Sequence, residues 1–241
     1  MRIAILQPSF FPWLGYFDQM ARVDRFVYLD DVQYTRRDWR NRNKIRTAQG
    51  WMWLTVPVVS RGHFGQALKE TRIDNSVAWK GKHLKALLHN YRRTPYFDLH
   101  FPGLESIYNK EWFFLLDLCL ETLTFLRRAL GITTLTCLGS SFQVQSAKQD
   151  KILQLCRSLE ADRYLSGDVA ENYLDVATFN KNGINVEFQN YHHPEYPQAY
   201  PGFAPYLSVV DLLFNQGCRS LDTLRMPETA VLSPAGEGDA G

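Results

Sequence analysis

Residues 2–15 read RIAILQPSFFPWLG, and this stretch decides the fold class because it joins an apolar run directly to a polar loop. A second apolar run, RFVYL at 25–29, ends in the pair Asp30 and Asp31. Continuous apolar runs of this length are typical of strands that are buried on both faces of a parallel sheet. The segment between them, GYFDQMARV at 15–23, predicts a short helix, so the chain opens as a β-α-β unit.

Strand-like and helical patterns alternate along the rest of the chain. This alternation predicts an α/β fold with a Rossmann-like, open and mainly parallel sheet that carries helices on both faces. Further strands are expected at 51–58, 163–167 and 184–189, and further helices at 77–91, 111–132, 147–161, 170–183 and 207–215.

No internal repeat or clear linker divides the chain, so residues 1–226 are expected to form a single α/β domain. The mostly helical segment at about 60–130 is expected to form an insertion or cap over the sheet. The chain ends in PAGEGDAG, which is small and polar, so residues 227–241 are expected to be a disordered tail.

The composition argues against several classes of protein. The 241 residues are 45% hydrophobic, enough for a sizeable core, and a net charge of +2 gives no general reason to expect nucleic acid or a membrane as partner. The four cysteines form no CxxC pair, so neither structural zinc nor a disulfide framework is expected. Without a signal peptide or a run of about 18 apolar residues, we expect a cytoplasmic protein that makes no membrane contact.

The loop after the first strand is stiff and aromatic where many α/β domains carry a glycine-rich phosphate loop. Pro8 and Pro12 fix φ, so the aromatic side chains that flank them could form a preorganised wall, and Gln7 would present an amide to a ligand. The alternative is that the rings merely seal the end of the sheet. A Walker-type phosphate loop is excluded because its glycines and lysine are missing. The candidate binding residues of this segment are Gln7, Trp13 and Tyr16.

Ligands of an open parallel sheet bind beyond the carboxyl ends of its strands, near the point where the strand order reverses. Polar groups follow four of the expected strands, and we expect them to converge at one end of the sheet. These groups are Gln7 and Pro8, Asp30 and Asp31, Ser166 to Asp168, and QNYHHPEY at 189–196.

The most unusual segment, DDVQYTRRDWRNRNKIR at 30–46, places six Lys and Arg residues within eleven positions and interleaves them with a tryptophan and two asparagines. Arginine matches phosphate oxygens with two parallel hydrogen bonds, so a nucleotide, a nucleotide sugar or an RNA backbone is the natural anion. The alternative is a solvated charged face. The candidate binding residues are Arg40, Asn41, Arg42 and Lys44.

Three residues are candidates for catalysis. Asp30 and Asp31 could act as a base, hold Mg²⁺ or pair with the arginines, but a lone Asp pair does not predict a metal site. His193 is a candidate acid or base, and a hydrogen-bonded loop histidine is the alternative. No G-x-S-x-G or HxGH motif is present.

Three further residues are candidates for substrate binding. Ser166 either caps the following helix or belongs to a backbone nest that receives a ligand. Tyr191 and Tyr196 lie in the same aromatic loop as His193 and could wall a pocket.

Several motifs occur in a characteristic order: ILQPSFFPWLGYFDQM, VYLDDVQYTRRDWRNRNKI, WLTVPV, YLSG and YHHPEYPQ followed by FAPYLSVVDLLFNQG. Together they resemble the WbqC-like protein family over about residues 1–218. Members of that family are typically encoded with enzymes of O-antigen and other surface-polysaccharide assembly, often near genes for nucleotide-linked amino sugars. A weaker likeness in fold connects the chain to nucleotidylyltransferases, pantothenate synthetases included, although their HxGH signature is missing.

The resemblance implies a transferase that forms an amide bond on an amino-sugar nucleotide or similar amine, in polysaccharide or natural-product biosynthesis. Arg40, Arg42 and Lys44 would grip an anion, and Asp30 or His193 would deprotonate the amine. An aminoacyl-tRNA is one activated donor that would suit the basic segment. The alternatives are an ATP-dependent ligase related to nucleotidyltransferases, and a non-catalytic scaffold of the pathway. No tightly bound cofactor is expected, ATP and Mg²⁺ belong to the ligase alternative alone, and the oligomeric state stays open.

Overall fold

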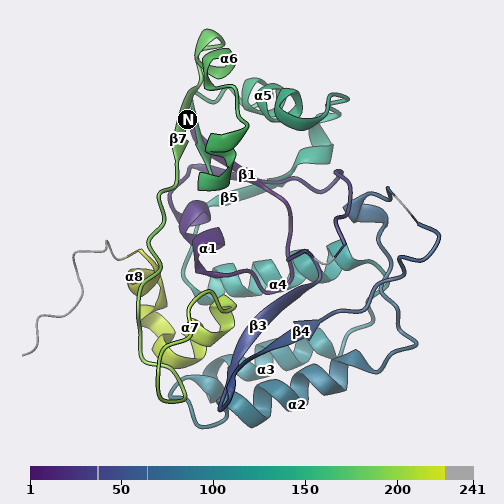
Figure 1. Ribbon diagram of the computed structural model, residues 1–241, viewed down its shortest axis with the longest axis vertical. Helices are drawn as coiled ribbons and strands as arrows, with labels where there is room; N and C mark the ends of the chain where they lie inside the picture. The colour runs from purple at the N-terminus through teal and green to yellow at the C-terminus, as the bar shows by residue number, and fades with distance from the viewer. Residues whose placement is uncertain (37, 64, 226–241) are drawn as a thin grey trace, which may run out of the picture.

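The computed structural model describes residues 1–36, 38–63 and 65–225, so the expected tail at 227–241 lies outside the described residues. The predicted α/β Rossmann-like fold is confirmed by a parallel sheet of five strands in the order β5-β2-β1-β6-β7, with helices on both faces (Figure 1). The strands are β1 (Arg2–Leu6), β2 (Arg25–Tyr28), β5 (Leu135–Leu138), β6 (Arg163–Ser166) and β7 (Asn185–Phe188).

Strand β1 lies at the centre of the sheet, and its side chains alternate between two separate cores. Ile3 and Ile5 pack into one cluster of buried residues, whereas Ala4 packs into the other. A strand with apolar layers on both sides needs a continuous apolar run, which is the pattern that the sequence shows at 2–6.

Two layers of helices cover the sheet, α5 and α6 above it and α1 and α4 below it in the view of Figure 1. The larger core lies between the sheet and the lower layer, and the smaller core lies under the upper layer. The helices around the sheet are α1 (Leu14–Ala21), α4 (Leu115–Ala129), α5 (Lys148–Ser158), α6 (Val176–Lys181), α7 (Val209–Gln216) and α8 (Ser220–Leu224).

The strand order reverses beside β1. The chain proceeds from β1 outward to β2 and β5 on one side, and then crosses to β6 and β7 on the other. The carboxyl ends of β1 and β6 therefore flank a switch point, which is where open α/β sheets bind ligands.

The segment between β2 and β5 leaves the sheet and builds the lower part of the molecule in Figure 1. It begins with an antiparallel hairpin, β3 (Arg42–Thr47) and β4 (Gly50–Thr55), which forms a second, two-stranded sheet. Helix α2 (Trp79–Tyr91) lies against β3 of this hairpin, α3 (Phe97–Tyr108) packs against α2, and the segment closes with α4.

The sequence did not predict β3, β5, α3 or the short helix α8. Strand β3 carries cations on its outward face, which hid its strand character behind a charge run. Strand β5 is a short edge strand of four half-exposed residues, and α3 contains Pro102, which is unfavourable inside a helix. The helix expected at 170–183 is divided into a 3₁₀ turn (Asp168–Asn172) and α6.

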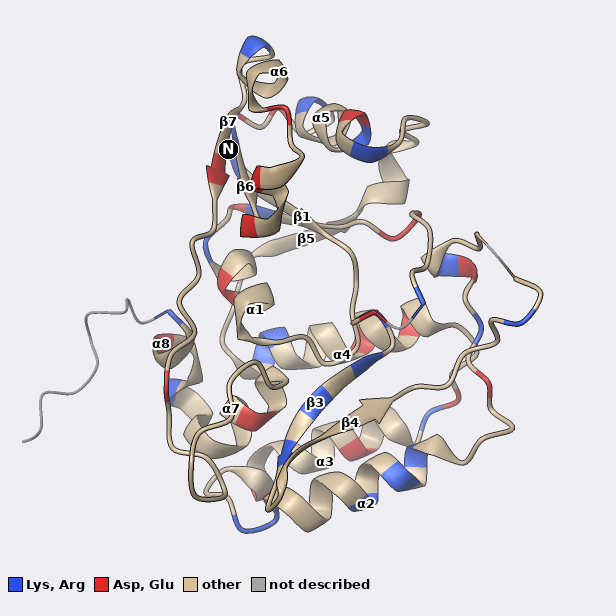
Figure 2. Ribbon diagram, in the orientation of Figure 1, with Lys and Arg blue, Asp and Glu red and all other residues tan. Residues whose placement is uncertain are grey.

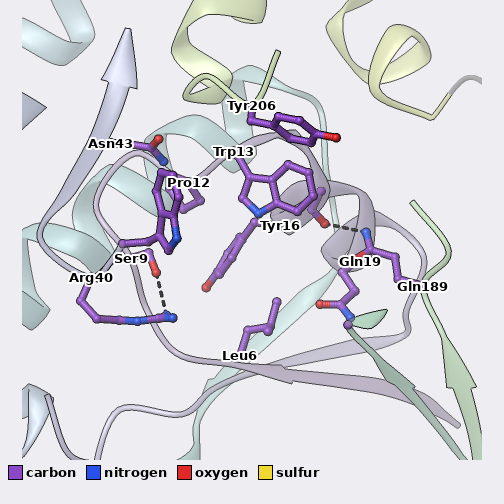
Figure 3. A pocket seen from close by; sticks show the side chains of 13 residues that line it. Leu6, Ser9, Pro12, Trp13, Tyr16, Gln19, Arg40, Asn43, Gln189 and Tyr206 are labelled. Carbon is purple, nitrogen blue, oxygen red and sulfur yellow. Dashed lines mark hydrogen bonds between the residues drawn. The ribbon is translucent and has the colours of Figure 1, made fainter. Parts of the chain in front are cut away.

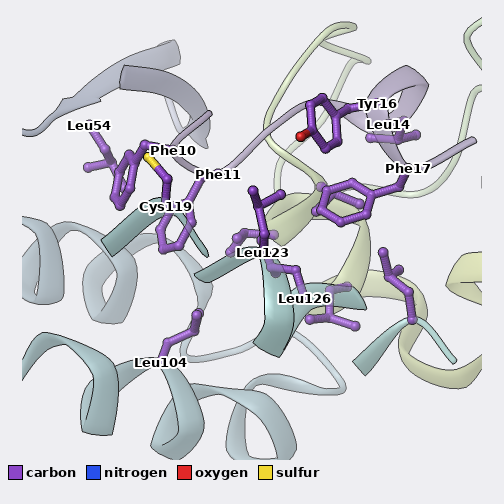
Figure 4. Packing of buried hydrophobic residues seen from close by; sticks show 14 of the residues in the cluster. Phe10, Phe11, Leu14, Tyr16, Phe17, Leu54, Leu104, Cys119, Leu123 and Leu126 are labelled. Carbon is purple, nitrogen blue, oxygen red and sulfur yellow. The ribbon is translucent and has the colours of Figure 1, made fainter. Parts of the chain in front are cut away.

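The loop that follows β1 is anchored in the larger core. Phe10 and Phe11 are fully buried and stack on each other with ring centroids 4.2 Å apart, close to Cys119 of α4 (Figure 4). Phe11 has φ +48°, a left-handed conformation that bulky residues rarely adopt. Asn43 donates a hydrogen bond to its carbonyl at 2.7 Å, so β3 helps to hold the strained loop in place.

The remaining short elements are 3₁₀ turns at Leu68–Glu70, Gly139–Phe142 and Gly217–Arg219. Within the part of the chain that the structure describes, no helix combines the length and apolarity needed to cross a bilayer.

Candidate functional site

A pocket of about 370 Å³ opens at the carboxyl ends of β1, β6 and β7, where the strand order reverses (Figure 3). The loop after β1, helix α1 and the start of β3 form its other walls. It is lined by Leu6, Ser9, Pro12, Trp13, Gly15, Tyr16, Gln19, Trp39, Arg40, Asn43, Gly167, Gln189 and Tyr206.

Aromatic rings form one wall of the pocket. Trp13 and Tyr206 line it, with ring centroids 5.9 Å apart. Tyr191 packs edge-on against Trp13 at 5.3 Å. The aromatic residues of the stiff loop therefore have two different roles: Phe10 and Phe11 belong to the core, and Trp13 faces the pocket.

Arg40 is fixed at the opposite side of the pocket by three acceptors. Its Nη1 donates to the Gln7 carbonyl at 3.2 Å and to Ser9 Oγ at 2.9 Å, and its Nε donates to Asp38 Oδ2 at 3.3 Å. A guanidinium held at Nε and Nη1 keeps a defined orientation, and no hydrogen bond of Nη2 occurs among the described residues. Such a fixed fork is suited to binding an anion.

Tyr16 reaches the same space from α1, and Figure 3 shows its hydroxyl directed toward the side of the pocket that holds Arg40. The residue is only 6% exposed, yet its hydroxyl has no hydrogen-bond partner among the described residues. Burial, and to a lesser degree Tyr28, raises the pKa of Tyr16 well above its usual value, so the hydroxyl is neutral and can donate. A buried polar group without a partner is costly, and a ligand would satisfy it.

Two more polar atoms near this loop are buried without a partner, Gln7 Oε1 and the Tyr191 hydroxyl. On the floor, Gln189 donates to the Gly15 carbonyl at 2.7 Å and to Asp18 Oδ2 at 2.8 Å, which fixes the end of β7 against α1. Of these unpartnered atoms, only the Tyr16 hydroxyl belongs to a residue that lines the pocket.

The pocket lining contains no Asp, Glu, His, Lys or Cys among the described residues. The buried thiols elsewhere are poor nucleophiles, since burial raises the pKa of Cys156 to about 12 and that of Cys119 further. The described part of the chain also holds no group of three or more His, Cys, Asp or Glu side chains placed to bind a metal ion. What the described lining provides is an aromatic wall and the hydrogen-bond donors of Arg40 and Tyr16.

Comparison with known proteins agrees with the family resemblance of the sequence motifs. The model of the WbqC-like protein family matches residues 7–223. The chain belongs to the WbqC-like protein family. It is 39% identical over 226 residues to the uncharacterized protein Rv1507c of Mycobacterium tuberculosis, covering 93% of this chain and 97% of that protein. No solved structure matches the chain significantly.

The structure of this WbqC-like chain brings three of the predicted binding residues, Trp13, Tyr16 and Arg40, to the pocket itself. Gln7 contributes its carbonyl as the acceptor for Arg40, and Tyr191 supports Trp13 from behind.

The candidate catalytic aspartates lie outside the lining. Asp30 is buried, and both of its oxygens accept hydrogen bonds from Ser140, from the backbone N–H at 3.0 Å and from Oγ at 2.7 Å. Asp31 forms an ion pair with Lys151 of α5 at 2.8 Å. These bonds fix the carboxyl end of β2 to the segments that follow β5, while Asp31 Oδ1 is buried without a partner among the described residues.

His193 also lies behind the wall, with both ring nitrogens occupied. Nε2 accepts from the Tyr206 backbone N–H at 3.1 Å, so Nδ1 carries the proton and donates to the Pro194 carbonyl at 2.9 Å. Burial lowers the pKa of His193, which keeps the ring neutral. The histidine positions Tyr206 and stacks on Trp13, with centroids 6.5 Å apart.

Three other candidates are engaged in the scaffold of the WbqC-like fold. Asn41 donates to the Val56 carbonyl at 2.7 Å and closes the open end of the hairpin. Ser166 is buried at the end of β6, and Tyr196 donates to Asp211 at 2.8 Å within the larger core. Arg42 and Lys44 lie on the outer face of the hairpin, over tryptophan rings.

Sequence reasoning missed several lining residues, among them Ser9, Asn43, Gln189 and Tyr206. The sequence position of Gln189 indicated that it could line the site, because it is the first polar residue after the last strand and that segment was expected to reach the site. Asn43 lies in the basic segment 30–46 that was expected to bind a ligand, but its strand was not recognised and so nothing distinguished it from Asn41.

Proposed function

We propose that this WbqC-like protein forms an amide bond by transferring an activated acyl or aminoacyl group to the amine of an amino-sugar nucleotide or a similar amine. The setting would be surface-polysaccharide or natural-product biosynthesis. The observation that carries the proposal is the convergence of Arg40 and the unpartnered Tyr16 hydroxyl on one aromatic-walled pocket at the switch point of the sheet.

The proposed roles follow from the chemistry of each group. Arg40 binds an anionic part of a substrate, such as a phosphate. The rings of Trp13 and Tyr206 hold a flat or sugar-like group against the wall. The neutral Tyr16 hydroxyl donates a hydrogen bond to the carbonyl oxygen that becomes negative when the amine attacks.

In the proposed step the amine nitrogen attacks the carbonyl carbon of the activated ester or thioester. The C–N bond forms, the bond to the leaving oxygen or sulfur breaks, and the proton lost by nitrogen ends on the leaving group through solvent. An amine beside electron-withdrawing groups is partly unprotonated near neutral pH, as an α-amino group is. The reaction therefore needs no enzymatic base, which agrees with a lining that offers no Asp, Glu or His among the described residues.

This arrangement favours a preactivated donor over the ligase alternative. Adenylation of a carboxylate by ATP needs Mg²⁺, which binds through carboxylate oxygens and phosphates. The described lining offers no carboxylate for that purpose. The absence of Asp, Glu, His, Lys and Cys from the described lining also favours a second candidate, a non-catalytic protein that binds the amine or nucleotide sugar for the pathway.

Incubation with UDP-glucosamine and acetyl-CoA, followed by mass spectrometry, separates these readings. The proposal expects the acceptor mass plus one acetyl group, formed without ATP and about tenfold more slowly by Tyr16→Phe, with the exposed Tyr173→Phe as matched control. A panel of aminoacyl thioesters and other nucleotide-linked amines extends the search. A rise in melting temperature with UDP-glucosamine, but no product with any donor of the panel, supports the binding protein instead. Product that requires ATP and releases AMP supports the ligase.

A further inference from the structure

The outer face of the β3–β4 hairpin carries a row of tryptophans and cations. Residues of a strand alternate between faces, and Lys44 is paired with Trp53 across the hairpin, so Arg42, Lys44, Trp51 and Trp53 share one face. The opposite face buries Ile45 and Leu54 in the larger core. We call the set of Trp39, Arg42, Lys44, Trp51 and Trp53 the tryptophan platform.

The platform is open to solvent rather than part of the core. Trp51 is 48% exposed and Trp39 is 40% exposed. Large aromatic side chains gathered on a surface mark interaction sites, because their exposure has no benefit for the folded monomer.

Cations are interleaved with these rings. Lys44 Nζ lies 4.3 Å from the ring centroid of Trp51, 5.4 Å from that of Trp53 and 5.7 Å from that of Trp39. The Arg42 guanidinium lies 4.3 Å from the Trp53 centroid. Each cation is therefore held beside an aromatic ring, which places positive charge at the spacing of the stacking surfaces.

The platform is continuous with the pocket. Trp39 lines the pocket and lies 5.3 Å from Trp53, which in turn lies 5.8 Å from Trp51, measured between ring centroids. The rings thus form a path from the tip of the hairpin to the pocket that contains Arg40.

The local charge is strongly positive although the whole chain carries only +2. Residues 36–46 contain six Lys and Arg and a single acid, Asp38, which is paired with Arg40. Figure 2 shows the positive residues distributed along β3. The surface therefore complements a chain that is both polyanionic and rich in flat groups.

We propose that the tryptophan platform binds the single-stranded end of an RNA, whose bases stack on the indoles while its phosphates contact Arg42 and Lys44. Stacking rings beside cations are the standard means of binding single-stranded nucleic acid. A single nucleotide covers one ring, whereas three connected rings suit successive nucleotides. The inference rests on the proposed function in one respect: an RNA that carries an ester at its end would deliver the activated group along this path to the pocket.

Fluorescence anisotropy with a labelled single-stranded 12-nucleotide RNA that ends in CCA tests the proposal. We expect Trp51→Ala to weaken binding by about tenfold with the salt dependence unchanged. Lys44→Gln should weaken binding and lower the slope of log Kd against log salt concentration by about 0.7, the value for one lost phosphate contact. Trp51→Phe should recover part of the affinity.

Matched controls are Phe113→Ala and Lys82→Gln, an exposed aromatic residue and an exposed lysine that lie outside the platform. The proposal is overturned if these variants weaken RNA binding as much as the platform variants do. It is also overturned if dextran sulfate competes as well as RNA of equal charge, which would indicate a general polyanion surface, or if the RNA does not bind.

The two proposals fail separately because the readout is RNA binding and not amide formation. Product formed from acetyl-CoA by a protein that binds no RNA overturns the RNA inference alone. RNA binding that depends on the platform, without amide product from the thioester panel or from an aminoacylated RNA ending in CCA, supports this inference and overturns the proposed function.

Discussion

Two regions of the molecule combine tyrosines with polar side chains, and they treat those groups in opposite ways. Around Asp211 in α7, every carboxylate oxygen has a partner: Tyr91 donates at 2.8 Å, Tyr196 at 2.8 Å and Gln198 at 3.0 Å. In the pocket, the buried Tyr16 hydroxyl has no partner among the described residues.

The paired network around Asp211 contributes to stability, whereas the unpaired Tyr16 hydroxyl is suited to binding. A fully paired buried network fixes the structure around it, and here it ties α2 and the loop after β7 to α7. A buried hydroxyl without a partner costs stability, and it persists where binding requires it. Substitutions should therefore have opposite consequences in the two regions.

The largest effect is expected from Asp211→Ala. The change leaves three buried donors unpaired and opens a small cavity, so the free energy of unfolding should fall by about 3–5 kcal/mol. Urea denaturation monitored by circular dichroism measures this loss. Glu195→Ala, which removes an exposed carboxylate of the loop between β7 and α7, serves as the control. Equal losses of stability in the two variants would contradict the conclusion that the buried hydrogen bonds of Asp211 stabilise the fold.

The same network should make stability depend on pH. Burial raises the pKa of Asp211 from 3.8 to about 6, against the lowering effect of the hydrogen bonds from Tyr91 and Tyr196. The folded state then holds this proton more tightly than the unfolded state does. The resulting stabilisation is complete below about pH 4 and is lost as the pH rises through about 6, by up to about 3 kcal/mol. Unfolding curves of wild type and Asp211→Asn between pH 4 and 7 measure it, and parallel pH dependences would rule out Asp211 as the source.

In the pocket, Arg40→Gln tests the anion-binding group. Loss of a charge-assisted contact should weaken binding of UDP-glucosamine by roughly tenfold to a hundredfold. Arg40→Lys should recover little, because lysine lacks the planar fork that Ser9 and Gln7 orient. Isothermal titration calorimetry measures both variants, with the exposed Arg219→Gln as control. Full recovery by lysine would mean that charge alone matters at this position.

The smallest and sharpest test is Tyr16→Phe, which removes only the unpartnered hydroxyl. The melting temperature should stay the same or rise, since stability should change by no more than about 1 kcal/mol in the favourable direction. Binding or turnover should nevertheless fall about tenfold. A clear loss of stability would show that the hydroxyl is paired within the protein, and the contrast with Asp211 would then disappear.

The fold was predictable wherever burial on both faces left a continuous apolar run. Strands β1, β2 and β6 follow from such runs, and α5 follows from its amphipathic pattern. Strand β7 was also expected, although it is a partly exposed edge strand. Strand β3 escaped because only one of its faces is buried, and the other carries Arg42 and Lys44. The stability of a half-buried strand in a hairpin depends on packing against its partner strand, and the strand's own composition does not reveal that packing.

The sequence by itself determined the residue types that follow the strands, such as the aromatic loop with Trp13 after β1. The strand order that brings Trp13, Tyr16 and Arg40 to one pocket belongs to the tertiary structure. Only the tertiary structure decided which polar atoms remain unpaired. Ser140 reaches Asp30 from 110 residues away, whereas nothing described reaches the Tyr16 hydroxyl. The physical reason is that a side chain's type is local, but its hydrogen-bond partner comes from whichever distant segment packs beside it.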